Sequence, residues 1–525
     1  MHLEPIPYTL PALVAHTAAR FGTRAAIIDG DTRLTWAQVD AQRRRAARAF
    51  IAAGIAKGDR VAIWAPNIHE WILCAMGLQT IGAVLVPVNT RYKGEEAGDV
   101  LRRSNARMLF TLESFLGVNY PALIAGESLP DLQRTVLLRR TDGSGTDWQA
   151  FLASGDAIPE AQVDARAAQV QPDDPMDLMF TSGTTGRPKA AVLTHYQNIR
   201  GFHTWSALFG LRETDRCLII PPFFHSFGYK GGWLACATKG AAILPGLTFE
   251  LDVLLPLIAR EKVTFIPGPP TVFYALLEHP RRAEFDLSSL RMGMVSASTV
   301  PVELVRRMYD DLRFDAVFTG YGLTENTALG AQTTPEDPPE KVATTSGRPM
   351  PDIEVRIVDA DGRALGPGVP GEILLRGYTV MKGYFGDPEG TRKTIDADGW
   401  LHTGDVGFLD AEGYLKITDR LKDMYIAGGF NCYPAEIEGI LLKMPGIAQA
   451  AVVGVPDARM GEVGKAFVIA RPGATISAGQ VIAYAREHMA NFKVPRYVEL
   501  IDAFPLNATG KVLKTELRKR VAPPG

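Results

Sequence analysis

The stretch MDLMFTSGTTGRPKAA, residues Met176–Ala191, is the most informative part of the chain. Its apolar start predicts a buried strand, which runs into a loop rich in glycine and hydroxyl residues. Glycine lets backbone N–H groups converge on phosphate oxygens, hydroxyls add donors, and a lysine adds positive charge. We therefore predict a phosphate-binding loop formed by Thr181, Ser182, Gly183, Thr184, Thr185, Gly186 and Lys189.

The spacing of this loop differs from that of the P-loop in kinases and GTPases. A P-loop has the pattern Gly-x-x-x-x-Gly-Lys-Ser/Thr. Here the glycines are Gly183 and Gly186, and Lys189 follows a proline. A flexible Ser/Gly linker is the alternative interpretation, but apolar residues precede the loop and the segment VLTH follows it. The pattern therefore favours an anion-binding loop outside the P-loop class.

Composition and charge narrow the classes of function. The 525 residues include 56 Lys+Arg and 58 Asp+Glu, and this near-neutral balance argues against a dedicated nucleic-acid binder. The four cysteines are far apart and form no Cys-x-x-Cys pair, which predicts reduced thiols and a cytoplasmic location. The N-terminus does not resemble a signal peptide. The apolar stretch Trp71–Val88 is interrupted by polar and turn residues, which favours a buried helix and strand over an integral membrane segment.

The order of predicted elements indicates an α/β fold. Strand-like segments at Arg24–Gly30 and Arg60–Pro66 flank a helical segment, which Thr35 and Gln38 open at the spacing of a capping box. Strand–helix–strand order with apolar strands predicts parallel sheets covered by helices. Short strands and Gly/Asp turns predict a β-rich subdomain over about residues 350–419. The residues from 420 onward look like a separate, net basic unit, although a solvated basic tail explains the charge equally well.

Further motifs follow the phosphate loop in a fixed order. They are PPFFHSFG with His225, SASTVP starting at Ser296, GYGLTE ending at Glu325, HTGD ending at Asp405, DRLKD with Arg420 and Lys422, GGFNCYPAEIE, and PLNATGK ending at Lys511. Together with the phosphate loop they resemble the motifs of the adenylate-forming superfamily. This superfamily includes acyl-CoA synthetases, peptide-synthetase adenylation domains and luciferases. The resemblance covers essentially the whole chain.

The resemblance implies a two-step reaction that uses ATP, Mg²⁺ and coenzyme A. A carboxylate attacks the α-phosphate of ATP to give an acyl-adenylate and pyrophosphate, and a thiol then displaces AMP. Lys511 is the implied catalytic residue of the first step, because an ammonium there would stabilise negative charge that grows in the transition state. Glu325 is the implied Mg²⁺ ligand and catalytic carboxylate, with Thr184 beside it. His225 is the third implied catalytic residue, although a histidine after a strand is often only packed or capping.

The remaining implied roles concern the nucleotide, coenzyme A and a moving domain. Besides the phosphate loop, the implied nucleotide-binding residues are Ser296, Ala297, Ser298, Gly320, Tyr321, Gly322, Leu323, Thr324, Asp405, Ile417 and Arg420. Gly428, Gly429 and Phe430 would admit the pantetheine chain of coenzyme A. The family architecture implies a large AMP-binding N-terminal domain, residues 1–419, and a small mobile α+β domain, residues 420–525. The small domain would rotate about a hinge at Lys422.

The predicted acyl pocket is apolar and aromatic. Its predicted lining residues are Phe224, Phe227, Tyr229, Trp233 and Thr271. With no obvious cation for a second substrate charge, the pocket suits an apolar carboxylic acid, either a fatty acid or a bulky ring acid. The segments PPFFHSFGYK, VATTSGRP and VIAYAREHMANFKVP resemble, in particular, bacterial synthetases of steroid-ring degradation, which activate a two-ring propanoate.

Two alternatives to a carboxylate–CoA ligase remain at this point. One is an adenylation enzyme that loads a carrier protein. The other is an adenylate-binding protein without catalysis, which the joint presence of Glu325 and Lys511 disfavours. The expected partners are the small-molecule acid, ATP and coenzyme A, with no nucleic acid. The sequence leaves the oligomeric state open, and a homodimer is compatible with it.

Overall fold

The computed structural model describes residues 3–140, 147–181, 188–296, 300–420, 423–427, 430–457, 460–489, 491–506 and 512–520. The chain divides into two compact units. The large unit contains residues 1–355 and 375–401, and the small unit contains residues 356–374 and 402–525. The predicted domain boundary between residues 419 and 420 remains a prediction.

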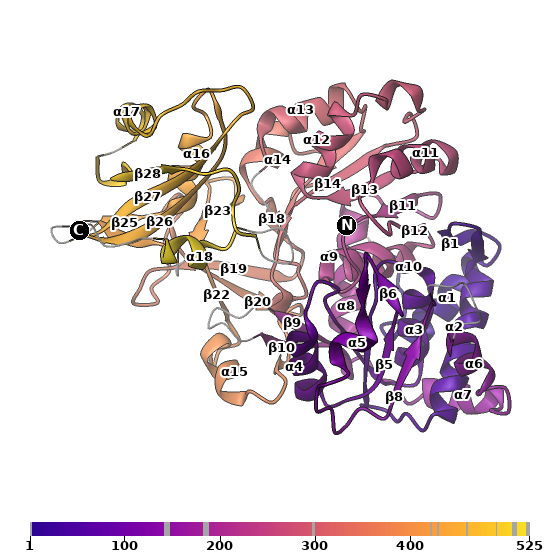
Figure 1. Ribbon diagram of the computed structural model, residues 1–525. Helices are drawn as coiled ribbons and strands as arrows, with labels where there is room; N and C mark the ends of the chain where they lie inside the picture. Colours follow the sequence, from indigo (N-terminus) through magenta and orange to yellow (C-terminus); the bar gives the residue numbers. More distant parts are fainter. Residues whose placement is uncertain are drawn as a thin grey trace. The chain divides into compact units, whose positions relative to one another are not determined.

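One seven-stranded sheet of the large unit is parallel except at its edge. Its order is β15 (Ala316–Phe318), β14 (Met292–Val295), β13 (Phe265–Gly268), β11 (Arg216–Ile219), β12 (Ala242–Pro245), β1 (Ala25–Asp29) and β2 (Thr32–Thr35). Only the β1–β2 pair is antiparallel. Side chains alternate between its faces: Leu218 packs with helices α11 (Leu251–Glu261), α12 (Pro270–Glu278) and α13 (Val302–Asp310), which lie together in Figure 1. Its neighbours Cys217 and Ile219 join the largest core of the unit.

The second seven-stranded sheet carries the predicted phosphate loop. Its order is β21 (Gly383–Tyr384), β10 (Lys189–Thr194), β9 (Pro175–Thr181), β4 (Val84–Pro87), β3 (Arg60–Trp64), β5 (Ala106–Thr111) and β8 (Arg134–Leu137). Strands β9, β4, β3, β5 and β8 are parallel, whereas β10 pairs antiparallel with both β9 and β21. The predicted strands at Arg24–Gly30 and Arg60–Pro66 are confirmed as β1 and β3.

Helices bury the faces of these sheets. Helix α3 (His69–Thr80) is buried at every residue from Glu70 to Thr80, and β4 follows it, so the apolar stretch at Trp71–Val88 is a buried helix and strand as predicted. No helix in the described part of the chain is long and apolar enough to cross a membrane. The other helices of the unit are α1 (Leu10–Phe21), α2 (Trp36–Ala52), α4 (Gly94–Ser104), α5 (Tyr120–Ile124), α6 (Asp147–Ala153), α7 (Glu160–Ala167), α8 (His195–Leu208), α9 (Ser226–Gly228), α10 (Ala235–Lys239), α14 (Pro339–Thr344) and α15 (Pro388–Thr394).

Short elements place the later motifs. They are the π-helix η1 (Tyr229–Leu234), the 3-10 helices η2 (Arg282–Glu284) and η3 (Thr324–Asn326), the hairpin β6 (Ser114–Phe115) with β7 (Val118–Asn119), and the small sheet β16 (Gly320–Tyr321), β17 (Ala331–Gln332) and β18 (Arg348–Pro349). A four-stranded sheet in the order β19 (Ile353–Val358), β20 (Gly371–Gly377), β22 (Leu401–Leu409) and β23 (Leu415–Arg420) occupies most of the segment predicted to be β-rich.

The small unit ends in an α+β arrangement. Its five-stranded sheet has the order β25 (Phe430–Cys432), β24 (Tyr425–Ala427), β27 (Gly461–Ala470) and β26 (Ile447–Asp457), with β28 (Tyr497–Leu500) on β27. Helices α16 (Pro434–Leu441) and α17 (Ala478–His488) bury Ile437, Leu441 and Val481 in its core. Helix α18 (Lys514–Lys519) and the 3-10 helix η4 (Asn491–Lys493) complete the unit. The mixed α/β fold class is therefore confirmed.

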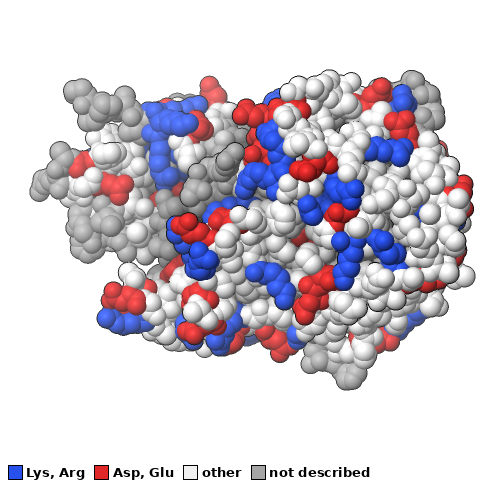
Figure 2. Space-filling view, turned by 90° about the horizontal axis from the view of Figure 1, so that it is seen from below, with Lys and Arg blue, Asp and Glu red and all other residues white. Residues whose placement is uncertain are grey.

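A smaller prediction, about the cysteines, also holds. All four cysteines are free and buried, as expected for reduced thiols. On the face shown in Figure 2, basic and acidic side chains are interspersed, in agreement with the formal charge of −2.

Candidate active site

The two ends of the predicted phosphate loop meet in a hairpin. Thr181 at the end of β9 pairs with Lys189 at the start of β10, and the Thr181 hydroxyl donates to the Lys189 carbonyl at 3.4 Å. The antiparallel pairing therefore fixes where the loop leaves the sheet and where it returns. Five predicted loop residues lie outside the described part of the chain: Ser182, Gly183, Thr184, Thr185 and Gly186.

A tyrosine that the sequence analysis missed connects Lys189 with Glu325. The Tyr384 hydroxyl donates to Oε1 of Glu325 at 2.9 Å. The ammonium of Lys189 lies 4.7 Å from the centre of the Tyr384 ring and 3.7 Å from Oδ2 of Asp387. Tyr384 reaches this place because β21 adds to the edge of β10, where Tyr384 pairs with Ala191. Two predicted site residues from distant segments thus contact the same aromatic side chain.

The motif GYGLTE holds Glu325 in a tight turn. The backbone N–H of Leu323 donates to Oδ1 of Asn326 at 2.7 Å, and Ala328 N–H donates to the Leu323 carbonyl at 2.7 Å. A Cβ on Gly322 would lie 2.1 Å from the carbonyl carbon of Ala328, so only glycine fits there. Because the backbone of η3 is fixed, the Glu325 side chain starts from a defined position.

The segment SASTVP, which begins at Ser296, starts at the carboxyl end of a strand. Ser296 follows β14, and its hydroxyl donates to the Gly320 carbonyl at 3.3 Å. Gly320 and Tyr321 form β16, and their register with Gln332 and Ala331 sets the direction of the following turn. The structure therefore brings Ser296 next to Gly320–Glu325, as ligand sites at the carboxyl ends of α/β strands require. Ala297 and Ser298 lie outside the described residues.

His225 caps a short helix through one of its ring nitrogens. Its side chain is exposed, and Nδ1 accepts a hydrogen bond from the Phe227 N–H at 3.3 Å at the start of α9. In the neutral ring the proton is therefore on Nε2. The enclosing protein and the positive charge of Lys230 lower the pKa of His225 below its ordinary value. His225 is thus a neutral imidazole at physiological pH, with Nε2–H as a donor.

The predicted acyl-pocket residues separate into two groups. Tyr229 and Trp233 lie in η1 with no exposed surface, and their rings stack at 4.9 Å between centres. Phe227 is half-buried and Thr271 is exposed, so these two are accessible to a ligand. The exposure of Phe224 is intermediate between those of the two groups, with 9% of its surface exposed. Contact between an acyl group and the Tyr229–Trp233 stack would require the core to open, and their assignment to the pocket stays a prediction.

A buried polar network anchors the helix that carries Tyr229 and Trp233. The hydroxyl of Tyr229 accepts a hydrogen bond from Nε2 of Gln79 at 2.8 Å. The next residue, Lys230, forms an ion pair of 3.2 Å with Asp177 on β9, and neither side chain is exposed. Asp177 also accepts from Asn198 at 2.8 Å. A π-helix with this buried anchor is common next to functional sites, because the extra residue redirects side chains.

In the small unit, the strand register pairs two predicted ribose contacts. Asp405 on β22 lies opposite Arg420 on β23, and Ile417 lies opposite Gly407. Asp405 is buried, with 5% of its surface exposed, and its N–H donates to the Thr403 hydroxyl at 3.1 Å. The side chains of Arg420 and Phe430 are outside the described part of the chain, as are Lys422, Gly428, Gly429 and Lys511 as a whole.

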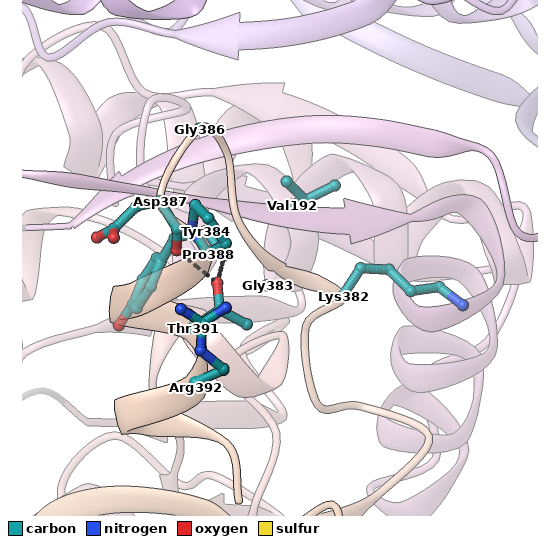
Figure 3. A pocket seen from close by; sticks show the side chains of 9 residues that line it. All are labelled: Val192, Lys382, Gly383, Tyr384, Gly386, Asp387, Pro388, Thr391 and Arg392. Atoms are coloured by element: carbon teal, nitrogen blue, oxygen red, sulfur yellow. Dashed lines mark hydrogen bonds between the residues drawn. The ribbon is translucent and has the colours of Figure 1, made fainter. Parts of the chain in front are cut away.

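A surface cavity of about 480 Å³ lies beside β21 (Figure 3). Figure 3 shows Lys382 pointing away from Tyr384, and the hydrogen bond from the Tyr384 N–H to the Thr391 hydroxyl. The cavity lining shares Tyr384 and Asp387 with the contacts described above, and its other members are Val192, Lys382, Gly383, Gly386, Pro388, Thr391 and Arg392.

Two groups of side chains could hold a cation, and they differ in charge compensation. Asp29, His69 and Glu70 bring their ligand atoms within 4.8 Å of one another. Arg139 already donates to both carboxylates at 2.7–2.8 Å, so that group is an ion-pair network. Glu325 is half-buried, and the only hydrogen bond to its carboxylate from a described residue is the neutral one from Tyr384. A carboxylate with this environment fits Mg²⁺, which prefers oxygen ligands.

The fold and this arrangement define a class of enzyme. Helix-covered α/β sheets carry a hydroxyl- and glycine-rich loop, and Tyr384 links the returning end of this loop to the acidic turn that holds Glu325. A separate unit carries a buried aspartate opposite an arginine. This combination agrees with what the resemblance to adenylate-forming enzymes implies.

Comparison with known proteins places the chain in a family. The profile of AMP-binding enzymes matches residues 14–385, and that of their C-terminal domain matches residues 436–511, so the chain belongs to the AMP-binding enzyme family. This confirms the resemblance to adenylate-forming enzymes. A Rhodococcus jostii ligase is 47% identical over 98% of this chain and 99% of its own length. A Mycobacterium tuberculosis ligase is 48% identical over 97% of this chain and 98% of its own. Both are named as CoA ligases of a 7a-methyl-1,5-dioxo-octahydroindenyl propanoyl group.

A solved structure agrees with this placement. The crystal structure of the anthranilate CoA ligase AuaEII in complex with anthranoyl-AMP is 29% identical and has a TM-score of 0.87. The alignment covers 98% of each chain. The structural neighbour thus contains an acyl-adenylate, the type of intermediate that the motifs imply.

Proposed function

We propose that this chain is an ATP-dependent carboxylate–CoA ligase that works through an acyl-adenylate, and that its acid is a bulky ring-bearing propanoate. The observation that carries this proposal is the identity of 47–48%, over nearly the full chain, to two ligases named for such an acid. Phe227 packs against the apolar core of the large unit, which supports an acid with a single charge. A medium-chain fatty acid is the second candidate acid.

In the first half-reaction, the chain must bring the negatively charged carboxylate of the acid close to the negatively charged phosphates of ATP. Lys189 and the loop before it would hold phosphate oxygens, and Glu325 would hold Mg²⁺, which supplies charge neutralisation at the phosphates. Lys511 would place its ammonium between the attacking carboxylate and the α-phosphate. Asp405 would accept hydrogen bonds from both ribose hydroxyls, since an ionised carboxylate can take two donors.

His225 would orient the acid. Its Nε2–H can donate to a carboxylate oxygen before the attack and to the acyl carbonyl afterwards. Because the lowered pKa keeps the ring neutral, this donor adds no positive charge that would hold the acid in its ground state. Orientation of this kind raises the rate by keeping the reacting atoms aligned.

In the second half-reaction, coenzyme A would enter through the segment Gly428–Phe430. Lys511 and this segment belong to the same small unit but serve different half-reactions in the proposed scheme. We therefore propose a rotation about Lys422 between the two steps, which is a known way of gating an active site. We also propose a cytoplasmic location, which the four free buried thiols support. A homodimer is part of the same proposal.

A panel of acids tests the proposal. Purified protein is incubated with ATP, Mg²⁺ and coenzyme A, and AMP formation is measured for two-ring propanoates, medium-chain fatty acids and aromatic acids. The proposal predicts acid-dependent AMP formation that requires coenzyme A, with the highest kcat/KM for a two-ring propanoate. A higher kcat/KM for linear acids would overturn the substrate assignment. AMP formation that depends on a carrier protein and not on coenzyme A would overturn the ligase assignment.

A further inference from the structure

We propose that Tyr384 is a positioning residue for Glu325. This inference rests on the proposed function, because it takes Glu325 as the carboxylate that holds Mg²⁺. The two residues are far apart in the chain, and the hydroxyl of Tyr384 meets Oε1 of Glu325 at 2.9 Å. Tyr384 has no place among the motifs that imply nucleotide contacts, so its role follows from the geometry alone.

A neutral donor is suited to this task. The phenol of a tyrosine is uncharged at physiological pH, because its ordinary pKa is about 10. The hydroxyl therefore restrains the carboxylate and leaves its negative charge in place. A lysine or arginine would neutralise that charge. It uses Oε1, and no other described residue donates to this carboxylate, so Oε2 keeps its capacity to bind a cation.

The backbone around Tyr384 is held on three sides. Its N–H donates to the Thr391 hydroxyl at 2.8 Å, and Figure 3 shows this bond. Its strand pairs with β10 at Ala191, and the N–H of Met381, three residues earlier, donates to the Glu325 carbonyl at 2.8 Å. The segment that carries the donor is thus tied to the backbone of the residue that accepts.

The ring of Tyr384 has a second contact. The Lys189 ammonium lies 4.7 Å from its centre, within the range of a cation–π interaction. One side chain therefore contacts both the returning end of the phosphate loop and the carboxylate proposed to hold the metal. Replacement by phenylalanine keeps the ring beside Lys189 and removes the hydroxyl, which donates to Glu325 and also forms a hydrogen bond with Thr394, so Tyr384→Phe tests the role of the hydroxyl.

Mn²⁺ binding measures this role without relying on turnover. Mn²⁺ is titrated into the full-length protein with α,β-methylene-ATP, and free Mn²⁺ is followed by electron paramagnetic resonance. Loss of a hydrogen bond that orients a metal ligand typically weakens metal affinity by about 10- to 100-fold, and we expect Tyr384→Phe to fall in this range. In the assay, the Mg²⁺ concentration for half-maximal adenylation should rise by a similar factor, while kcat recovers at saturating Mg²⁺.

Two further variants serve as controls. Tyr120→Phe removes a buried hydroxyl that donates to the Thr90 carbonyl at 3.1 Å, so it matches the loss of one tyrosine hydrogen bond outside the proposed site. It should leave Mn²⁺ affinity unchanged. Thr391→Val removes the acceptor for the Tyr384 N–H and should weaken Mn²⁺ binding by about 2- to 10-fold, which keeps the proposal testable if Tyr384→Phe does not fold.

Glu325→Gln separates failure of this inference from failure of the proposed function. If Glu325→Gln weakens Mn²⁺ binding and Tyr384→Phe does not, the positioning role is overturned while the metal role of Glu325 stands. If Glu325→Gln leaves Mn²⁺ binding unchanged, the metal role fails and the inference fails with it. If both weaken binding, Tyr384→Phe should add little in the Glu325→Gln background, because the two changes act on one contact. Full additivity of the two losses would contradict the proposal.

Discussion

Two regions of the large unit hold their side chains in different ways. Around Glu325 the contacts are individual hydrogen bonds, from Tyr384 to the carboxylate and from Leu323 N–H to the Asn326 side chain. Around Trp233 the contacts are stacked and edge-on aromatic rings, including Tyr229 and Trp71, in the core of the unit. The predicted nucleotide side is therefore sensitive to single polar atoms, whereas the predicted acyl side is sensitive to volume.

The largest effect is expected at Lys511 of the small unit, which would act on the nucleotide in the proposed first half-reaction. Lys511→Ala should slow adenylate formation by about 10²- to 10³-fold, since one group that stabilises the transition-state charge is lost. Thioester formation from a preformed adenylate should survive. Rapid-quench measurement of each half-reaction checks this. Equal loss in both half-reactions would show that Lys511 does not belong to the first step alone.

On the acyl side, Trp233→Ala should act mainly on stability. Removal of a fully buried tryptophan typically costs about 3–5 kcal/mol in the free energy of unfolding, because a cavity is left in the core. Urea denaturation measures the loss. If the variant instead keeps wild-type stability and accepts larger acids, Trp233 lines an accessible pocket and the contrast between the two regions is wrong.

A buried histidine at the start of α8 gives a pH-dependent prediction. His195 accepts a hydrogen bond from Leu10 N–H, and burial lowers its pKa from 6.5 to about 3. Between these values the unfolded chain binds more protons, so acidification below pH 6.5 destabilises the fold by about 1.4 kcal/mol per pH unit from this group.

The variant His195→Gln isolates that contribution. Glutamine can still accept from Leu10 but does not titrate, so the variant should lose less stability than the wild type between pH 6.5 and pH 4.5. Urea midpoints at both pH values supply the comparison. Parallel pH profiles for the two proteins would refute the assignment.

The smallest effect is expected at Ser296. Ser296→Gly removes the 3.3 Å hydrogen bond to the Gly320 carbonyl, and an ordinary hydrogen bond contributes about 0.5–1.5 kcal/mol. We expect KM for ATP to rise by at most about tenfold, with kcat nearly unchanged. A large fall in kcat would mean that the serine acts on the reaction itself, and the nucleotide side would then depend on Ser296 as strongly as on Lys511.

The sequence was most informative where local pattern decides structure. The strands at Arg24–Gly30 and Arg60–Pro66 are present, and Thr35 and Gln38 form the predicted capping box, with the Thr35 N–H donating to Gln38 at 2.8 Å. Ser296 and Gly320, which the motifs marked as nucleotide-binding, follow the neighbouring strands β14 and β15. These features depend on short-range spacing and on strand topology, which sequence carries directly.

Long-range contacts were not predictable. Tyr384 approaches Glu325 because β21 adds to the edge of β10, and no local pattern marks that pairing. The side that an aromatic residue faces is equally hidden: Tyr229 and Trp233 were predicted to line the acyl pocket, and the sequence does not show that their rings stack inside the core. His225 was expected either to cap or to act, and it caps through Nδ1, which leaves Nε2 outside the cap.

Exchange of labelled pyrophosphate into ATP tests the central claim most directly. With a two-ring propanoate, ATP and Mg²⁺ but no coenzyme A, the account predicts acid-dependent exchange, which falls by about two to three orders of magnitude in Lys511→Ala. Exchange that appears only when coenzyme A is present, or no exchange with any acid, would contradict an acyl-adenylate formed before the thiol reacts.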